Sequence, residues 1–252
     1  MARWLERKTL SIGNASPRAT AASHASVSAT AAKLLCITTV NTRWISSAVA
    51  VPAADAARAL SGAAVPVAVD PDGALVRSLR PAAVVDARMA KRNLGTSRAD
   101  APVTIALGPG FEAGRDVDFV IETKRGPCMG RVIESGSAEP DTGVPGEVGG
   151  VAAERLLRAP AAGEFRSRAR IGDLVRAGDA VAEVGGTAVR ARIPGLLRGL
   201  AADGLVVEQG DKVGDVDPRG ATVDARVISD KARGVGRAVL AALRARGVGS
   251  DG

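Results

Sequence analysis

The stretch GDLVRAGDAVAEV at residues 172–184 aligns without gaps on GLVVEQGDKVGDV at residues 204–216. The offset is 32 residues, and the two copies share Gly, Val, Gly, Asp, Val and Val, with Glu183 facing Asp215. Each copy alternates apolar and polar residues around a Gly-Asp turn, a pattern that predicts two short strands joined by that turn. The repeat indicates that this part of the chain consists of two similar β units.

Two such β units describe the two-fold hammerhead barrel found in biotinyl and lipoyl domains, which we expect over residues 164–222. Carrier domains of that type modify a lysine in the hairpin midway between the repeats. No lysine occurs here from Arg125 to Asp211, and Pro194 and Gly195 stand at the midpoint. We therefore expect a barrel to which neither biotin nor lipoate is attached.

Upstream of the repeat, the chain from Val51 onward has the pattern of an α/β fold. A helix-like run at 53–60 precedes two apolar strands at 65–69 and 82–85, and the strands are followed by Asp70 and Asp86. A parallel strand delivers polar side chains to a ligand crevice at its carboxyl end. The alternative is a helix-capping or turn role, which the following proline favours for Asp70 and which stays open for Asp86.

Residues 101–163 predict a β-rich middle region, with strands in VTIAL (103–107), VDFVIET (117–123) and GRVIESG (130–136). The loop GPGFEAG (108–114) can expose backbone N–H groups to an anion. It lacks the Lys-Ser/Thr ending of a P-loop, however, and it leads into a strand. The pattern favours the other interpretation, that its glycines adopt positive φ in a tight turn.

The chain closes with ISDKARGVGRAVLAALRARG (228–247), which predicts a terminal helix within residues 223–252. Ser229 is suited to the N-cap, and Val235, Val239 and Leu243 recur at helical spacing. This apolar stripe predicts packing against the rest of the protein. We interpret the four arginines of this segment as a solvated face: Arg233, Arg237, Arg244 and Arg246.

Composition and charge narrow the classes of partner. The 252 residues, 46% of them apolar, leave room for one large domain or two ordinary ones. Lys and Arg number 34 against 27 Asp and Glu, but residues 1–54 hold six of these basic side chains and a single acid, so the remainder is nearly neutral. No basic stretch is interleaved with the two Trp and three Phe for base stacking. We expect no nucleic acid partner.

The cysteines, the single histidine and the apolar runs exclude several further classes of protein. Cys36 and Cys128 are too far apart in sequence for a disulfide framework or a paired zinc site, which favours a reducing compartment. His24 is the single histidine, which excludes a histidine-centred hydrolase mechanism. The best apolar run, 27–40, is interrupted by Lys33, so we expect no membrane insertion and a cytoplasmic location.

Residues 1–50 differ from the rest of the chain. They are rich in Ser, Thr, Ala and Arg, nearly free of acidic residues, and lack helical or strand periodicity. Three interpretations stay open: a transit peptide, a flexible or disordered tail, and a frame-altered start that precedes the true domain. Residues 51–100 are then a partial Rossmann-like α/β domain.

Eight longer strings occur in order between residues 51 and 243: VVDARMAKRNLGT (84–96), ALGPGFEAG (106–114) with DVDFVIET (116–123), ESGSAEPDTGVPGEVGG (134–150), ERLLRAP (154–160), LLRGL (196–200), DVDPRG (215–220) and ISDKAR (228–233). Together they resemble the accessory proteins of selenium-dependent molybdenum hydroxylases. The resemblance implies a dinucleotide-type α/β domain followed by the β-rich and barrel regions. Its implied partner is a molybdenum hydroxylase or the machinery that matures it.

The chain also departs from that family. Members open with a glycine-rich strand-turn-helix that would bind a nucleotide or phosphate, and residues 1–48 contain no such motif. The family pattern further places a histidine after the Arg-Gly of ETKRGPCMGRV, where this chain has Pro127. A metal or acid/base role of that histidine therefore does not carry over, and we predict no metal ligands.

The segment after strand 82–85 offers an acid, a cation and amide donors to a ligand. Lys91 is our first candidate, since it can pair with a phosphate of a nucleotide or molybdopterin-type cofactor while Asn93 fixes orientation; the alternative is a surface pair between Lys91 and Asp86. Two further pairs, Glu122 with Arg125 and Asp217 with Arg219, either contact ligand or lock turns. The candidate cofactor-binding residues are Asp86, Lys91, Asn93, Thr96, Gly108, Gly110, Glu122, Arg125, Asp217 and Arg219. Whether the chain catalyses a reaction stays open, and the sequence assigns no catalytic residue.

Three functions remain for this α/β plus β fold. The first is a maturation factor that helps a xanthine-dehydrogenase-like molybdenum hydroxylase acquire its selenium-dependent centre. The second is a nucleotide-dependent α/β enzyme, which requires the missing glycine-rich fingerprint. The third is an unmodified barrel module that binds partner proteins and no small molecule.

Overall fold

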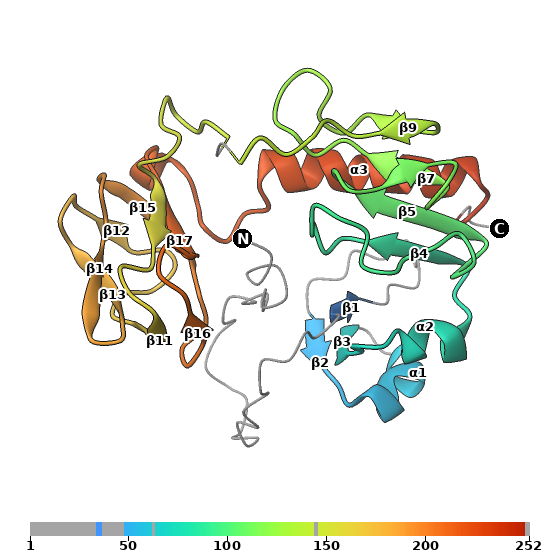
Figure 1. Cartoon of the computed structure of the whole chain (residues 1–252), viewed down its shortest axis with the longest axis horizontal. Coiled ribbons are helices and arrows are strands. Elements are labelled where there is room, and N and C mark those ends of the chain that lie inside the picture. Colours follow the sequence, from blue (N-terminus) through green and yellow to red (C-terminus); the bar gives the residue numbers. More distant parts are fainter. Residues whose placement is uncertain (1–33, 37–47, 62–63, 144–145, 250–252) are drawn as a thin grey trace. The chain divides into compact units, whose positions relative to one another are not determined.

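The computed structural model describes residues 34–36, 48–61, 64–143 and 146–249 (Figure 1). The chain divides into two compact units: the repeat unit, which contains residues 143–228, and the α/β unit, which contains 31–142 and 229–252. Most of the predicted tail at 1–50 lies outside the described residues. The exceptions are Leu34–Cys36 and Ala48–Ala50, which form strands although the sequence lacks periodicity there.

The repeat unit contains two copies of a four-stranded motif. The first copy consists of β10 (Leu156–Arg158), β11 (Gly163–Ser167), β12 (Leu174–Val175) and β13 (Ala180–Val184). The second consists of β14 (Thr187–Arg190), β15 (Gly195–Leu200), β16 (Val206–Val207) and β17 (Lys212–Asp217). A short 3-10 turn, η3 (Gly220–Thr222), follows. The predicted repeat of β units is confirmed, and it is longer than the sequence identities indicate.

Strand pairing obeys the same 32-residue offset. One sheet has the order β10-β17-β15-β12 and the other β14-β13-β11-β16, so exchanging the two copies converts each sheet into the other. Turn hydrogen bonds repeat as well: the N–H of Gly178 donates to the carbonyl of Ala191 and that of Gly210 to Ala159, each at 2.8 Å. The two copies therefore exchange strands, and neither can form its sheet alone.

A single apolar cluster fills this unit. Phe165 on β11 and Leu197 on β15 occupy matching positions of the two copies and are fully buried. Val181 and Val213 are a second matching pair in the same cluster. Because matching residues of both copies lie in this single cluster, the unit has one core rather than two.

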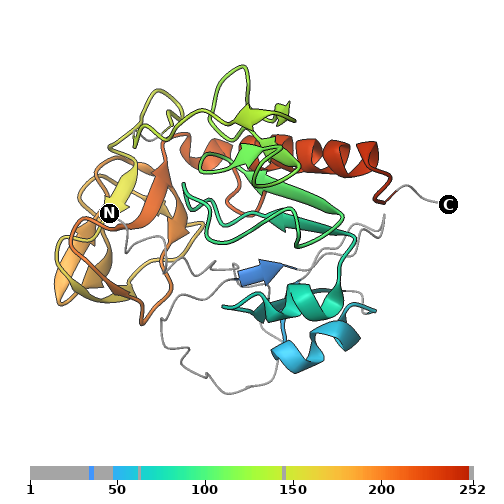
Figure 2. The same ribbon diagram turned by 45° about the vertical axis from the view of Figure 1, so that its right-hand side comes forward.

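In the α/β unit, three parallel strands form the sheet that positions the candidate site. β4 (Ala83–Asp86), β5 (Val103–Leu107) and β7 (Phe119–Ile121) lie side by side, and β8 (Val132–Ile133) joins β7 in antiparallel orientation. The long helix α3 (Asp230–Ala245) runs along one face of this sheet in both views (Figures 1 and 2).

The predicted terminal helix is confirmed in detail. The Ser229 hydroxyl accepts the N–H of Ala232 at 3.1 Å and thereby caps the helix. Val235 and Leu243 are buried in a cluster with Ile105, Phe119 and Ile121 of the sheet. The four arginines of the predicted solvated face are exposed.

The opposite face of the sheet is covered by the pair β6 (Glu112–Ala113) and β9 (Gly136–Ser137). Phe111, Val117 and Val120 form the buried cluster between these elements. A separate small sheet has the order β1-β3-β2, from Leu34–Cys36, Val65–Val69 and Ala48–Ala50. It packs with η2 (Ala53–Asp55), α1 (Ala56–Ala59) and α2 (Ala74–Leu79).

Two sequence expectations need correction. The strands ending at Asp70 and Asp86 do not share a sheet: β3 pairs with β1 and β2, whereas β4 pairs with β5. Asp70 instead accepts the N–H groups of Ala74 and Leu75 at 2.8 and 3.0 Å, so its carboxylate caps α2, as its alternative interpretation predicted. The predicted start of the barrel at residue 164 also differs from the structure, because β10 precedes that residue and yet pairs with β17.

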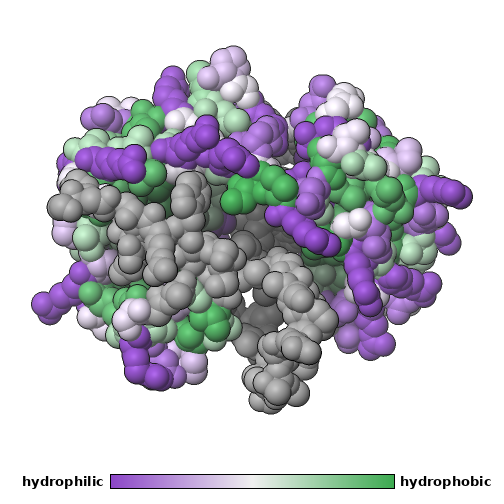
Figure 3. Space-filling model, turned by 180° about the vertical axis from the view of Figure 1, so that it is seen from behind, coloured by the Kyte–Doolittle hydropathy of each residue, from purple (hydrophilic) through white to green (hydrophobic). Residues whose placement is uncertain are grey.

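The architecture is thus a mixed α/β fold, rich in sheet and with few helices in its described parts. On the face shown in Figure 3, hydrophilic residues make up much of the described surface and hydrophobic residues form separate patches. Among the described residues, no helix has both the length and the apolar character that crossing a membrane requires.

The shared core predicts matched effects of truncation. Phe165→Ala and Leu197→Ala should each lower the free energy of unfolding of the repeat unit by about 3–5 kcal/mol, because each leaves a cavity in the one cluster. Phe165→Leu should cost only about 1.5 kcal/mol, since the other copy already has leucine there. Calorimetric unfolding checks this, with Leu174→Ala as the exposed control, for which we expect a change within about 0.5 kcal/mol. Equal costs for Leu197 and Leu174 would contradict the shared core.

Candidate functional site

The carboxyl ends of β4, β5 and β7 bring three loops together in the α/β unit. The loop after β5 contains Gly108 and Gly110, both with positive φ. A methyl group on Gly110 would lie 2.5 Å from Cα of Arg92 and from the carbonyl carbon of Lys91, in the loop after β4. A methyl group on Gly108 would lie 2.6 Å from the hydroxyl of Thr123, in the loop after β7. Glycines are therefore required for the three loops to meet.

The loop after β4 is held in an unusual backbone conformation. Met89 and Lys91 have φ of 57° and 65°, a left-handed region that non-glycine residues rarely occupy. Asn93 closes the end of the loop, because its side-chain oxygen accepts the N–H groups of Gly95 and Thr96 at 2.8 and 2.9 Å. The structure therefore shows that Asn93 closes the loop. Its role in orienting a ligand stays a prediction.

Asp86 lies at the end of β4 in a closed polar network. Its carboxylate accepts hydrogen bonds from the Arg88 guanidinium and, at 2.7 Å, from the Thr96 hydroxyl. Arg88 also donates to that hydroxyl at 2.8 Å. Burial acts to raise the pKa of Asp86, but the hydrogen bonds and charge of Arg88 outweigh it, so this pKa lies below its ordinary value. Asp86 is an ionised carboxylate that organises its loop.

Glu122 lies directly after β7 and is fully buried. Its two carboxylate oxygens accept the N–H groups of Lys124 and Glu139, each at 2.8 Å. Glu122 therefore ties the loop after β7 to the chain segment near residue 139. The predicted pair with Arg125 does not form, because Arg125 binds Asp230 at the start of α3 through two bonds of 2.6 and 3.0 Å.

Basic side chains converge where these loops meet α3. Lys91 forms an ion pair with Asp141 at 3.0 Å rather than with Asp86, and both side chains are more than a third exposed. Lys231, in the first turn of α3, is half-buried and lies within electrostatic range of Lys91 and Arg125. These three residues, Lys91, Arg125 and Lys231, are called the cation cluster below.

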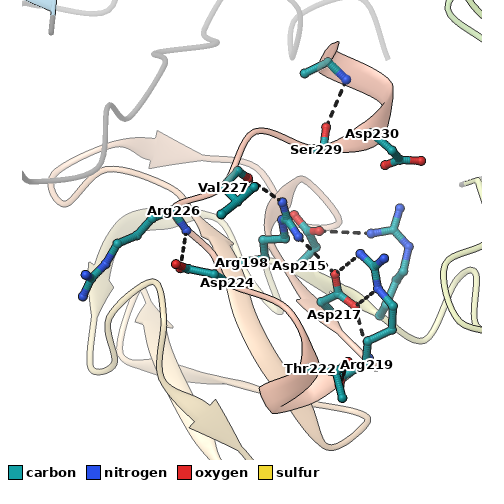
Figure 4. Close-up of polar contacts among 12 residues, drawn as sticks. Arg198, Asp215, Asp217, Arg219, Thr222, Asp224, Arg226, Val227, Ser229 and Asp230 are labelled. Carbon is teal, nitrogen blue, oxygen red and sulfur yellow. Dashed lines mark hydrogen bonds and ion pairs between the residues drawn. The ribbon is translucent and has the colours of Figure 1, made fainter. Parts of the chain in front are cut away.

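Asp217 and Arg219 belong to the repeat unit and form the predicted pair there (Figure 4). Arg219 donates from Nε and a terminal nitrogen at 2.9 and 2.7 Å, and Arg198 adds a longer bond of 3.4 Å. The hydrogen bonds from Arg219 lower the pKa of Asp217, although burial acts in the opposite direction. This arrangement locks the turn after β17, as the alternative interpretation of that pair predicted.

The structure thus brings eight of the ten predicted site residues together at one edge of the α/β unit, and places Asp217 and Arg219 in the other unit. Sequence reasoning missed Arg88, which neutralises Asp86, and it missed Asp141. It assigned Lys231 to the terminal helix without a role. Their sequence separation from the predicted residues left no local signal for Asp141 and Lys231, whereas Arg88 lies only two residues from Asp86 and could have been found.

Chemically, the cation cluster suits an anion better than a metal ion. Within the described ranges, no group of three or more His, Cys, Asp or Glu side chains is arranged to hold a metal. Ammonium and guanidinium groups are donors without acceptor capacity, and they match phosphate or carboxylate oxygens.

Sequence comparison finds similarity to a curated protein but to no family model. No family model matches the chain. The chain is 50% identical over 199 residues to the "Uncharacterized protein YqeB" of Escherichia coli (strain K12), a match that covers 79% of this chain. The chain spans only 37% of the length of that relative.

Solved structures give only distant similarity. An aspartoacylase family protein from Mesorhizobium loti matches with a TM-score of 0.24 and 16% identity, over 34% of this chain and 27% of that one. The ectoine utilization protein EutE (DoeB) from Ruegeria pomeroyi matches with a TM-score of 0.24 and 21% identity, over the same shares. Similarities this low carry no argument about activity.

The approach of Gly110 to the loop after β4 predicts a large effect of one methyl group. Gly110→Ala should destabilise the α/β unit by more than the about 1–2 kcal/mol that positive φ alone costs, because the added carbon overlaps backbone. Gly136→Ala is the matched control: its φ is also positive, at 89°, but nothing lies within 4 Å of the added methyl. Calorimetry of both variants checks the difference, and equal effects would contradict a close loop contact.

The lowered pKa of Asp86 predicts a pH dependence with a defined sign. A carboxylate whose pKa is lower in the folded protein stabilises it above the pKa of the unfolded chain, about 4, and loses this effect as the pH falls through the folded pKa. Asp86→Asn should therefore cost about 3 kcal/mol near pH 7, because the largely buried Arg88 loses its partner, and less below pH 4.

Unfolding temperatures between pH 3 and pH 7 test this dependence. Asp72→Asn, at an exposed turn position, is the control and should change little across the range. A cost of Asp86→Asn that stays constant with pH would show that the charge of Asp86 does not stabilise the fold.

Proposed function

We propose that this chain is an accessory protein that helps a xanthine-dehydrogenase-like molybdenum hydroxylase acquire its selenium-dependent centre. In this proposal the α/β unit holds a phosphate-bearing ligand, a nucleotide or a molybdopterin-type precursor, at the loops after β4, β5 and β7. The repeat unit acts as a hammerhead barrel of the biotinyl/lipoyl type without an attached cofactor. The host enzyme or its maturation machinery is the partner.

One observation carries the proposal: four of the strings that resemble this family supply residues to one polar edge of the α/β unit. The loop after β4 belongs to the string at 84–96, the glycine loop to 106–114, Glu122 to 116–123 and Lys231 to 228–233. These strings meet through the contacts of Gly108 and Gly110 and through the charges around Lys231. Residues that contribute only to stability need not lie at one polar edge, whereas residues that share a ligand must.

The residues present fit a phosphate-bearing group at this edge. Lys91 and Lys231 can contact phosphate oxygens, Arg125 can orient them, and the glycine loop allows a ligand to approach the backbone. In this proposal the residues of the edge bind and orient the ligand, which is the role of a carrier or presenting protein.

The barrel module that binds proteins only is the second candidate. It is supported by the exchange of strands between the repeats and by the lack of a lysine at the midpoint between them. It predicts no stabilisation by small molecules. Nucleotides or pterins that raise the unfolding temperature of the full chain would favour the first proposal.

Gene deletion and rescue test the proposed function. Deleting the gene should lower the specific activity and bound selenium of the host's xanthine-type hydroxylase, and restoring this 252-residue chain should recover both. Rescue with Gly110→Ala should be weak, while Gly136→Ala should rescue, because only the first disrupts the loops at the proposed site.

Unchanged activity and selenium after deletion would reject the maturation role. Rescue only by a longer gene would mean that this chain lacks a required part. Equal rescue by the two glycine variants would remove the α/β site from the proposal.

A further inference from the structure

Lys231 is a basic side chain whose surroundings disfavour its charged form. It lies in the first turn of α3, where the positive end of the helix dipole opposes a cation. It is half-buried, and within the described part of the chain no carboxylate lies within ion-pair distance of its ammonium group. An uncharged residue here would avoid all of these costs.

The surroundings of Lys231 are predominantly unfavourable to its charge. Burial lowers its pKa most, and the positive charges of Arg125 and Lys91 lower it further. Glu122 and Asp141 act in the opposite direction but do not compensate, so the pKa stays below its ordinary value. Glu122 is committed to two backbone N–H groups, and Asp141 to Lys91.

The other two cations are held in place. Asp141 positions Lys91, and Asp230 positions Arg125 through a two-bond pair. Lys91 also sits on backbone that Gly110 contacts directly. The cluster therefore draws on three separate segments: the loop after β4, the loop after β7 and the start of α3.

We infer that the cation cluster of Lys91, Arg125 and Lys231 binds a phosphate group of a small-molecule ligand, with Lys231 supplying positive charge that the ligand-free protein leaves unbalanced. The inference deepens the proposed function and rests on it only for the identity of the whole ligand. A doubly charged oxyanion fits a group of three cations better than a single carboxylate does. It would also offset the repulsion within the cluster.

Site residues selected for binding often reduce the stability of the free protein. Replacing Lys231 should therefore have two effects of opposite sign. Lys231→Gln should raise the unfolding temperature of the ligand-free full chain, because burial, repulsion and the helix dipole no longer act on a charge. The same change should weaken binding of inorganic pyrophosphate about tenfold or more, since one charge-assisted contact is lost.

Arg233→Gln is the matched control. Arg233 is two residues further along α3, exposed, and carries the same charge, so its removal reproduces the change in net charge without touching the cluster. Titration calorimetry with pyrophosphate and phosphate at low ionic strength gives the affinities, and thermal unfolding gives the stabilities. Affinity should fall as salt is added, because the attraction is electrostatic.

The outcomes separate clearly. Weaker binding and higher stability for Lys231→Gln, with Arg233→Gln like the wild type in binding, would support the inference. No pyrophosphate or phosphate binding by the wild-type chain, equal binding by both variants, or lower stability of Lys231→Gln would overturn it. If Lys231→Gln does not fold, Lys91→Gln supplies the affinity test and should also weaken binding.

This experiment is independent of the hydroxylase. Pyrophosphate binding by the purified chain, together with unchanged hydroxylase after gene deletion, would reject the maturation role and keep the phosphate site. Rescue of the hydroxylase without any phosphate binding would do the reverse.

Discussion

The close approach of Gly110 to the backbone of Lys91 and Arg92 is the contact on which the candidate site depends. It places the loop after β5 directly against the loop after β4, where two non-glycine residues have left-handed backbone. Such conformations persist only when the surroundings enforce them. Here Asn93 closes the loop, and Asp86 with Arg88 anchors its beginning. The result is a rigid platform that presents Lys91.

Charge is distributed unevenly over that platform. The acids near it are used internally: Asp86 by Arg88 and Thr96, Glu122 by two backbone N–H groups, and Asp230 by Arg125. Lys231 is the member of the cation cluster without such a partner among the described residues. The anion-binding edge that we propose depends on this imbalance, because the fold neutralises most of the charges there and leaves one of them half-buried.

The repeat unit follows a different principle. Strands from the two copies alternate within each sheet, so the 32-residue repeat is one cooperative structure with one core. Its buried charges, such as Asp217 with Arg198 and Arg219, secure turns. No lysine stands at the midpoint between the two copies. In the proposed function this unit presents a surface to a partner, whereas the polar edge of the α/β unit holds a small ligand.

Local pattern alone determined the repeat, the strands at 65–69 and 103–107, and the terminal helix with its Ser229 cap, because alternation, helical spacing and capping residues are read within a few positions. The sequence also marked Asp86, Lys91, Gly110 and Glu122, since each follows or adjoins a strand end. Only the tertiary structure decided that Asp70 and Asp86 belong to different sheets and that Asp217 lies in another unit. It alone brought Lys231 within electrostatic range of Lys91, because proximity across more than a hundred residues depends on packing of the helix on the sheet and leaves no local trace in the sequence.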